Sequence, residues 1–212
     1  PGEADREGSA GGGLANTGFT STKGAYDASK ISVVNGKLQI ITNANSDSAH
    51  TNALQVSVNA GTNFRVQSRL VGPFDAINAG NEQQAIYFGI DQTHYLKAEV
   101  EWASTKRVLT IWKQDGSSGS IVKRIDLPGN NANTLDLRID VVPVQTNPYN
   151  GTPIANVYYA KDGGAFTKIN DTNISIPTSW ITAVDTEAGV ITSHQGSGGA
   201  AFTAIYENFA VT

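Results

Sequence analysis

Short runs of β-branched and aromatic residues recur along this chain from Ser32 onward, separated by clusters of Gly, Asn, Asp and Pro. This recurrence predicts strands joined by turns, and it constrains the fold more than any other feature of the sequence. No stretch has the apolar periodicity of a helix, although Pro177–Ala183 could form one helical turn. The expected strands are Ile31–Val34, Lys37–Thr42, Ala53–Val58, Phe64–Leu70, Gln84–Asp91, His94–Trp102, Arg107–Gln114, Ser120–Asp126, Leu135–Val142, Ala155–Lys161, Ala165–Ile169, Ala188–Ser193 and Phe202–Val211.

Three short segments between these runs have the composition of hairpin turns. Asn35–Gly36 and Asp162–Gly164 each supply residues that tolerate positive φ, and Ser117–Gly119 supplies a third turn. About a dozen strands joined in this way predict an all-β fold, a two-sheet antiparallel jelly-roll sandwich. No change in composition divides it, so we expect a single domain over residues 14–212. Residues 1–13, rich in Gly and charge, are expected to be a flexible lead-in or linker.

Composition excludes several classes of protein. The 212 residues include no cysteine, so disulfides and thiolate metal sites are absent. Acidic and basic residues are dispersed around a net charge of -4, which argues against a nucleic-acid partner. No run approaches the roughly 18 apolar residues of a membrane span, so we expect no membrane insertion. Few charges among many small polar residues are typical of exported bacterial β-proteins. Because Met is also absent, at Pro1 included, we expect a processed product or an excised module.

Alternation along the strands separates core side chains from outward ones. Leu96, Ala98, Val100 and Trp102 share one side of their strand, and Leu109 and Ile111 share the same side of the next. We expect these to face the core, and we apply the same rule to the strands around Ile86 and Leu137. The outward set, which we expect to share one sheet surface, is Tyr87, Tyr95, Lys97, Glu99, Glu101, Trp112, Asp136, Arg138 and Asp140.

Aromatic rings mixed with charged groups suit a sugar, because rings stack on C–H groups and charges bind hydroxyls. We therefore predict a ligand site in which Trp112 and Tyr95 form an aromatic platform. Tyr87, Glu99, Glu101 and Arg138 would flank this platform. The alternative is a solvated face of cross-strand ion pairs. Trp112 either meets a ligand or lies under a loop, since an outward Trp is costly to leave bare.

The segment Gln84–Lys97, with the sequence QAIYFGIDQTHYLK, resembles the hairpin "AGLFFGxDQDNYVKL" of concanavalin A-like, laminin G-like modules. His94 stands where such hairpins usually carry Asn, and the loop Thr146–Pro153 is long. The resemblance extends over nearly the whole chain, through Thr17–Thr20, Val34–Leu38, Gly189–Ser193 and Asn208–Val211. It implies a jelly roll in a secreted bacterial multidomain protein, with a carbohydrate-binding or adhesive role.

Two other chemistries remain open. Glu99 and Glu101 project from one face, at a spacing slightly beyond the roughly 5–5.5 Å of retaining glycosidases. The sequence EVEWA that begins at Glu99 lacks the middle Asp and final Glu of laminarinase-like enzymes. Oxygen-rich loops suit Ca²⁺, and Asp75, Asn78 and Glu82 are weak candidates, although the same residues are ordinary in turns. No other cofactor is expected.

We therefore carry three functional hypotheses. The first is a non-catalytic carbohydrate-binding or adhesive module that is secreted or on the cell surface, within a larger multidomain chain. The second is a jelly-roll glycoside hydrolase or polysaccharide lyase. The third is a structural or protein-interaction module of a cell-surface assembly. If the sheet face is not the site, the loops Asp75–Glu82 and Thr146–Pro153 at the sandwich edge are the next candidates.

Overall fold

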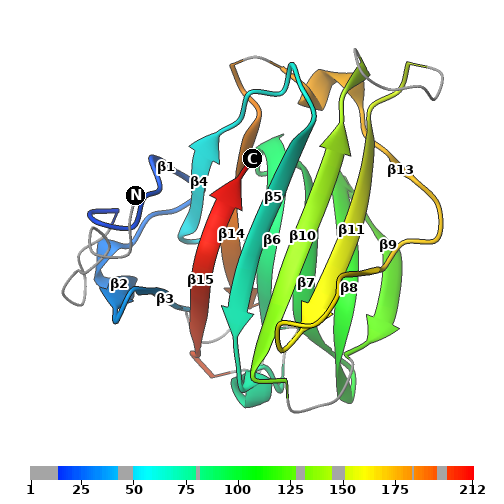
Figure 1. Ribbon diagram of the computed structural model, residues 1–212. Helices are drawn as coiled ribbons and strands as arrows, with labels where there is room; N and C mark the ends of the chain where they lie inside the picture. The colour runs from blue at the N-terminus through cyan, green and yellow to red at the C-terminus, as the bar shows by residue number, and fades with distance from the viewer. Residues whose placement is uncertain are drawn as a thin grey trace.

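A computed structural model describes residues 14–42, 50–79, 82–127, 132–144, 151–182, 184–194 and 200–212. Within these ranges the chain forms two antiparallel sheets that pack face to face, with sheet B toward the viewer and sheet A behind it in Figure 1. The predicted all-β, two-sheet sandwich is confirmed. The expected lead-in 1–13 and most of the loop Thr146–Pro153 lie outside the described residues.

Sheet A has seven strands in the order β1-β4-β14-β6-β7-β8-β9. Strands β6 to β9 are consecutive hairpins, whereas β14 comes from near the C-terminus and pairs with both β4 and β6. Such long crossings between sheets are characteristic of a jelly roll. The strand bounds are β1 Ser21–Lys23, β4 Ala53–Ser57, β14 Glu187–His194, β6 Glu82–Asp91, β7 His94–Ala103, β8 Lys106–Asp115 and β9 Ser118–Asp126.

Sheet B runs in the order β12-β11-β10-β5-β15-β3-β2, and β13 pairs with β11 beside this path. The short 3-10 helices η2 (Ala28–Lys30), η3 (Phe74–Ala76) and η5 (Thr178–Trp180) join strands, and η5 confirms the predicted helical turn. No helix in the described ranges is long and apolar enough to cross a membrane. The strand bounds are β12 Thr167–Lys168, β11 Ile154–Lys161, β10 Thr134–Val142, β5 Phe64–Val71, β15 Thr203–Val211, β3 Lys37–Ile41, β2 Ile31–Val34 and β13 Ile174–Ser175.

Two of the three predicted turns lie where the sequence places them. Asn35 and Gly36 have φ values of 50° and 72°, and Asp162 and Gly163 have values of 49° and 75°. Two successive positive φ values define the hairpin turn whose twist matches the adjoining strands. The third prediction, Ser117–Gly119, began one residue late, because the turn between β8 and β9 is formed by Gly116 and Ser117, with a φ of 64° at Gly116. Gly119 instead lies within β9.

The core lies between the two sheets, and the predicted alternation is confirmed. Leu96, Ala98 and Val100 of β7 are completely buried in the main hydrophobic cluster, and Trp102 packs against it. Leu109 and Ile111 of β8, Ile86 and Phe88 of β6, and Leu135, Leu137, Ile139 and Val141 of β10 belong to the same cluster. The outward side chains of β6, β7 and β8 therefore share the outer face of sheet A.

The expectation that Asp136, Arg138 and Asp140 share that surface was wrong. These residues are on β10, which pairs with β5 and β11 in sheet B. Outward from sheet B is the opposite side of the sandwich from the outer face of sheet A. Alternation predicts which side chains point away from the core, but it does not predict to which sheet a strand belongs.

Candidate functional site

The outer face of sheet A brings together five of the six residues predicted to bind a ligand. Cross-strand register aligns Tyr87 with Lys97 and Trp112, and in the next row it aligns Glu99 with Thr110. Tyr95 and Glu101 lie on the same face of β7, two residues beyond Lys97 and Glu99 respectively. This shared face places the five side chains on one surface.

At the centre of this face, a buried ion pair joins Lys97 to Glu99. The Lys97 Nζ lies 2.6 Å from Glu99 Oε2 and also donates a hydrogen bond to the side-chain oxygen of Gln83. Ser193 Oγ donates to the same Gln83 oxygen at 3.0 Å. Burial raises the pKa of the Glu99 carboxyl to about 7, an effect that Lys97 opposes and Glu101 reinforces. Glu99 is therefore a carboxyl that exchanges protons near neutral pH.

The second carboxyl of the predicted pair, Glu101, is held by donors from the two neighbouring strands. Thr110 Oγ1 donates to Glu101 Oε1 at 2.6 Å, and Arg124 of β9 donates to the same oxygen. The Arg124 Nε donates in turn to Thr110 Oγ1 at 3.0 Å. These contacts fix the orientation of the Glu101 carboxyl.

The aromatic residues of this face form a small apolar cluster instead of an open platform. Tyr87 and Tyr95 pack with Ala53, Ala85 and Ile191, and only 5% of Tyr95 is exposed. Burial raises the pKa of the Tyr95 hydroxyl, which lies 3.2 Å from the Nε2 of His50. Tyr95 therefore lies on the outward face of its strand, as predicted, but it is buried in this cluster and does not form an exposed platform.

Trp112 lies against this cluster and keeps intermediate exposure. Its Nε1 donates to the side-chain oxygen of Gln114 at 3.1 Å. Its ring lies over Gly119, where an added Cβ would come within 2.1 Å of Trp112 Cζ2. The outward direction predicted for Trp112 is therefore confirmed, and its support comes from a glycine on the neighbouring strand.

A hollow of about 340 Å³ opens at the edge of the same face. Lys23 of β1 is only 6% exposed, and its Nζ has no hydrogen-bond acceptor among the described residues. Burial lowers the pKa of the Lys23 ammonium, an effect that the carboxylates of Glu187 and Asp91 oppose. The hollow is lined by Thr22, Lys23, Gly24, Gln55, Ile90, Asp91, Gln92, Thr93 and Glu187.

The hollow is connected to the outer face by hydrogen bonds. The Tyr87 hydroxyl donates to Gln55 Oε1 at 2.8 Å, and the Gln55 amide donates to Glu187. The Lys23 Nζ also lies 5.5 Å from the centre of the Tyr87 ring. Sequence analysis missed Lys23, Gln55 and Glu187, because β1 is only three residues long and these strands come together through long crossings.

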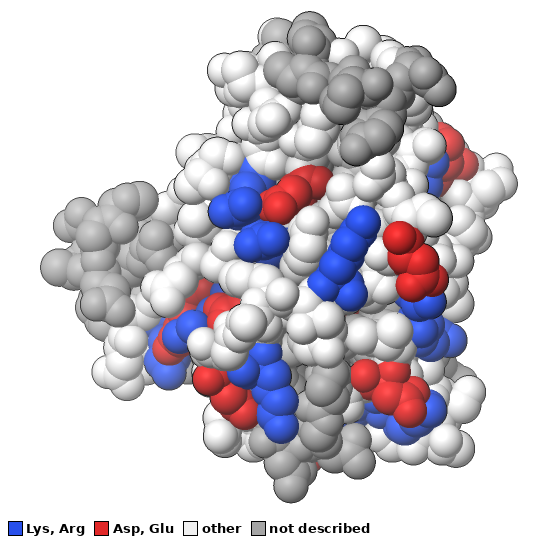
Figure 2. All heavy atoms as spheres, turned by 45° about the vertical axis from the view of Figure 1, so that its right-hand side comes forward, with Lys and Arg blue, Asp and Glu red and all other residues white. Residues whose placement is uncertain are grey.

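Arg138, the sixth predicted residue, has different surroundings on the outer face of sheet B. Its guanidinium lies 4.2 Å from the ring centre of Tyr158 and 4.4 Å from that of Phe166. Its Nε is 3.4 Å from Asp140 Oδ1. Part of the molecular surface around sheet B is seen in Figure 2, where acidic and basic groups lie close together without a large patch of either sign.

The carboxylates among the candidate calcium ligands make hydrogen bonds and an ion pair within the protein. Glu82 Oε2 accepts hydrogen bonds from the backbone N–H groups of Asn78 at 2.6 Å and Ala79 at 3.0 Å. The Asp75 carboxylate is 71% exposed and lies 3.4 Å from Arg107 Nη2. In the described part of the chain, no group of three or more His, Cys, Asp or Glu residues could hold a metal ion. Calcium binding stays a prediction.

Comparisons with known proteins relate this chain to others through its fold. No protein-family model matches the sequence, and the search of curated proteins gave no match. Among solved structures, a functionally unknown protein from Saccharomyces cerevisiae is 18% identical with a TM-score of 0.64, and the match covers 86% of this chain and 90% of that one.

Two enzymes share the fold at similarly low sequence identity. The xylan β-1,4-xylosidase of Bacillus halodurans is 14% identical with a TM-score of 0.63, and the match covers 86% of this chain but 34% of the enzyme. The endo-1,3-β-glucanase of Streptomyces sioyaensis is 14% identical with a TM-score of 0.54, covering 98% of this chain and 93% of the enzyme. This chain thus spans about a third of the xylosidase and nearly all of the glucanase. At these identities the likeness shows the fold alone.

Proposed function

We propose that this chain recognises a carbohydrate on the outer face of sheet A, through the hollow beside Lys23. The observation that carries the proposal is the buried Lys23 ammonium, whose N–H donors have no acceptor among the described residues although the hollow opens beside them. A sugar hydroxyl can accept from this ammonium and donate to a carboxylate of Glu187 or Asp91. Such charge-assisted hydrogen bonds are stronger than those between neutral groups.

The solved structures support a connection with carbohydrates. The xylosidase and the glucanase are both described as enzymes that act on polysaccharides or their fragments. Xylo-oligosaccharides and 1,3-β-gluco-oligosaccharides are therefore the first ligands to test. Export from the cell, and membership of a larger multidomain chain, belong to the same proposal.

Glycoside hydrolysis is the second candidate, and the comparisons favour it over binding alone because both carbohydrate-related neighbours are hydrolases. Within this chain the supporting observation is the pair Glu99 and Glu101. A carboxyl with a pKa of about 7 is suited to act as a general acid, and glycoside hydrolases pair such an acid with a second carboxyl group, a place that Glu101 could take. Strand neighbours two residues apart are separated by roughly 6.6 Å along the backbone and project from the same face of the strand.

Burial and pairing of the two carboxyls favour binding without catalysis. Glu99 is nearly inaccessible and ion-paired with Lys97, and Glu101 is engaged by Thr110 and Arg124. A substrate could reach these groups only if the side chains above them moved. The geometry of the described residues therefore supports recognition at the hollow more directly than reaction at the ion pair.

One experiment separates the candidates. Binding and release of reducing sugar are measured with both oligosaccharide series, using the wild type, Glu99→Gln and Glu101→Gln. Binding without release supports a recognition module. Release by the wild type that both variants lose supports hydrolysis. Absence of both binding and release contradicts the proposal and leaves a structural or protein-interaction role in a cell-surface assembly.

A further inference from the structure

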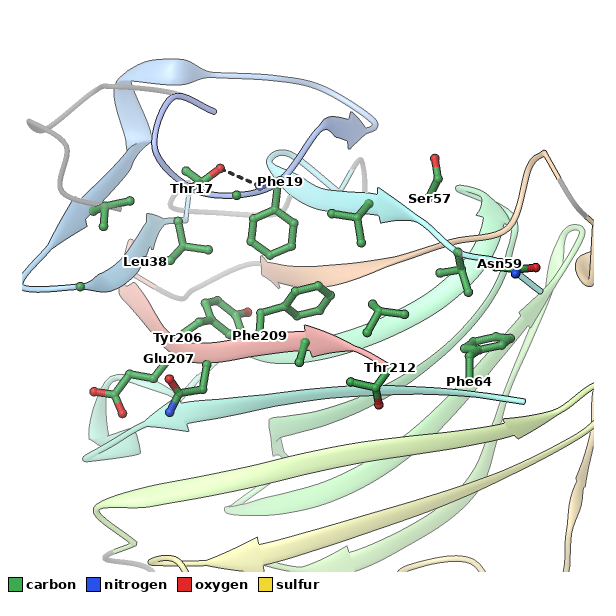
Figure 3. A pocket seen from close by; sticks show the side chains of 18 of the residues that line it. Thr17, Phe19, Leu38, Ser57, Asn59, Phe64, Tyr206, Glu207, Phe209 and Thr212 are labelled. Atoms are coloured by element: carbon green, nitrogen blue, oxygen red, sulfur yellow. Dashed lines mark hydrogen bonds between the residues drawn. The ribbon is translucent and has the colours of Figure 1, made fainter. Parts of the chain in front are cut away.

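A second and larger cavity lies at the edge of the sandwich, between β4 of sheet A and β15 of sheet B (Figure 3). Its volume is about 520 Å³. The segment Thr17–Phe19 and the β2–β3 hairpin contribute further walls. It shares no lining residue with the hollow beside Lys23, so the two sites are separate.

The walls of this edge cavity are largely apolar. The rings of Phe19 and Phe209 pack against each other at a tilt, with ring centres 4.8 Å apart (Figure 3). Other apolar side chains that line the cavity are Val33, Leu38, Val56, Val58, Phe64 and Val211. A space of this size lined by apolar and aromatic groups has the dimensions of a small-molecule site.

A β-bulge in β15 shapes one wall. The pairing of β15 with β5 shifts register between Glu207 and Ala210, and Asn208 has a φ of 52°. Tyr206 faces the core, so regular alternation would next turn Asn208 and Ala210 inward. The extra residue turns Phe209 and Val211 inward instead, and both pack against the core cluster. Asn tolerates this positive φ better than most residues other than glycine, and the resulting bulge places Phe209 in the cavity wall.

Three polar side chains around the edge cavity, including its charged one, are engaged within the protein. Glu207, the one charged residue among the described lining residues, pairs with Lys37 at 2.7 Å. The Tyr206 hydroxyl donates to the carbonyl of Ile191 at 2.7 Å. The Thr17 hydroxyl donates to the carbonyl of Leu14 at 2.8 Å. A charged ligand would lose its hydration here without gaining a free counter-charge.

We propose that this edge cavity binds a neutral, largely apolar small molecule. The size of the space, its aromatic walls and the internal pairing of its charged residue all select against an ionised ligand. The site is independent of carbohydrate recognition at the hollow, and either can fail without the other.

The test uses N-phenyl-1-naphthylamine, a neutral dye whose fluorescence rises in apolar surroundings. We expect saturable binding of one dye per protein. Val56→Trp places a larger side chain in the cavity wall and should weaken binding at least tenfold. Val122→Trp on β9, at a position 38% exposed and remote from the cavity, is the matched control and should bind like the wild type. Phe209→Ala, which removes the wall without overpacking it, should also weaken binding.

A matched pair of competitors tests the preference for neutral ligands. Methyl 2-naphthoate should displace the dye, whereas ionised 2-naphthoate should need at least tenfold higher concentration. The proposal is overturned if the dye shows no saturable binding, or if folded Val56→Trp and Phe209→Ala proteins both bind like Val122→Trp. Equal displacement by the ester and the carboxylate overturns the assignment of a neutral ligand.

Discussion

Lys97 and Glu99 lie two residues apart on β7, and their charged ends meet at 2.6 Å with side-chain exposures of 4% and 1%. A pair this deeply buried on the outer face of a sheet differs from the solvated ion pairs that usually cover such faces. Its two charges have lost most of their hydration, so each depends on the other. The consequences can be measured without knowing the ligand.

Removing one partner of this pair should cost more than replacing both. Lys97→Met leaves the buried Glu99 carboxyl without its cation, so at pH 7 this carboxyl must take up a proton and lose its strongest partner, which should lower the free energy of unfolding by about 1–3 kcal/mol. Lys97→Met combined with Glu99→Leu should lower it by about 1 kcal/mol or less, because neither buried polar group of the pair remains. Urea denaturation of the single and double variants measures both effects. Equal losses would show that the pairing is not what stabilises this region.

Glu99 should make stability depend on pH in a definite direction. Its pKa is raised from the ordinary value of 4.5 to about 7, so the folded protein holds this proton more tightly than the unfolded chain. The stability that this tighter proton binding contributes is therefore complete below about pH 4.5. About 3 kcal/mol of the free energy of unfolding is lost as the pH rises through 7. Glu99→Gln should flatten the decline in stability between pH 5 and pH 8. Parallel pH profiles for the two proteins would contradict the raised pKa.

The sequence was sufficient to predict the strands of the described residues other than the short β1 and β13, most turns and the direction of each outward side chain. Val100 faces the core and Glu101 faces outward because alternation is a local property of one strand. Local pattern could not assign Arg138 to sheet B, since sheet membership depends on long crossings. Nor could it predict the hollow, in which Lys23 of a three-residue strand meets Glu187 from near the C-terminus. The burial of Tyr95 was missed because it depends on small residues of other strands.

Gly119 and Trp112 should be energetically coupled. An added Cβ at Gly119 would clash with the Trp112 ring, so Gly119→Ala should lower stability by about 1–3 kcal/mol in the wild type. In a Trp112→Ala background the same change should cost little, because the ring has gone. A double-mutant cycle from urea denaturation measures the coupling. Equal costs in the two backgrounds would mean that the ring does not depend on Gly119 for its position.

Arg138 should contribute to stability but not to carbohydrate recognition. Its guanidinium lies between the rings of Tyr158 and Phe166, so Arg138→Met should lower stability by about 1–2 kcal/mol. It should leave glycan affinity unchanged, because the residue lies on the outer face of the other sheet. Thermal melts and a binding titration on this one variant check both statements.

The location of the glycan site is tested most directly by isothermal titration calorimetry. An oligosaccharide that the wild type binds is titrated into the wild type, Lys23→Met and Arg138→Met. Methionine keeps the length of the lysine stem but removes the buried ammonium. We predict at least tenfold weaker binding for Lys23→Met, with Arg138→Met indistinguishable from the wild type. Wild-type affinity in a folded Lys23→Met protein, or loss of binding in Arg138→Met, would contradict a site on the outer face of sheet A.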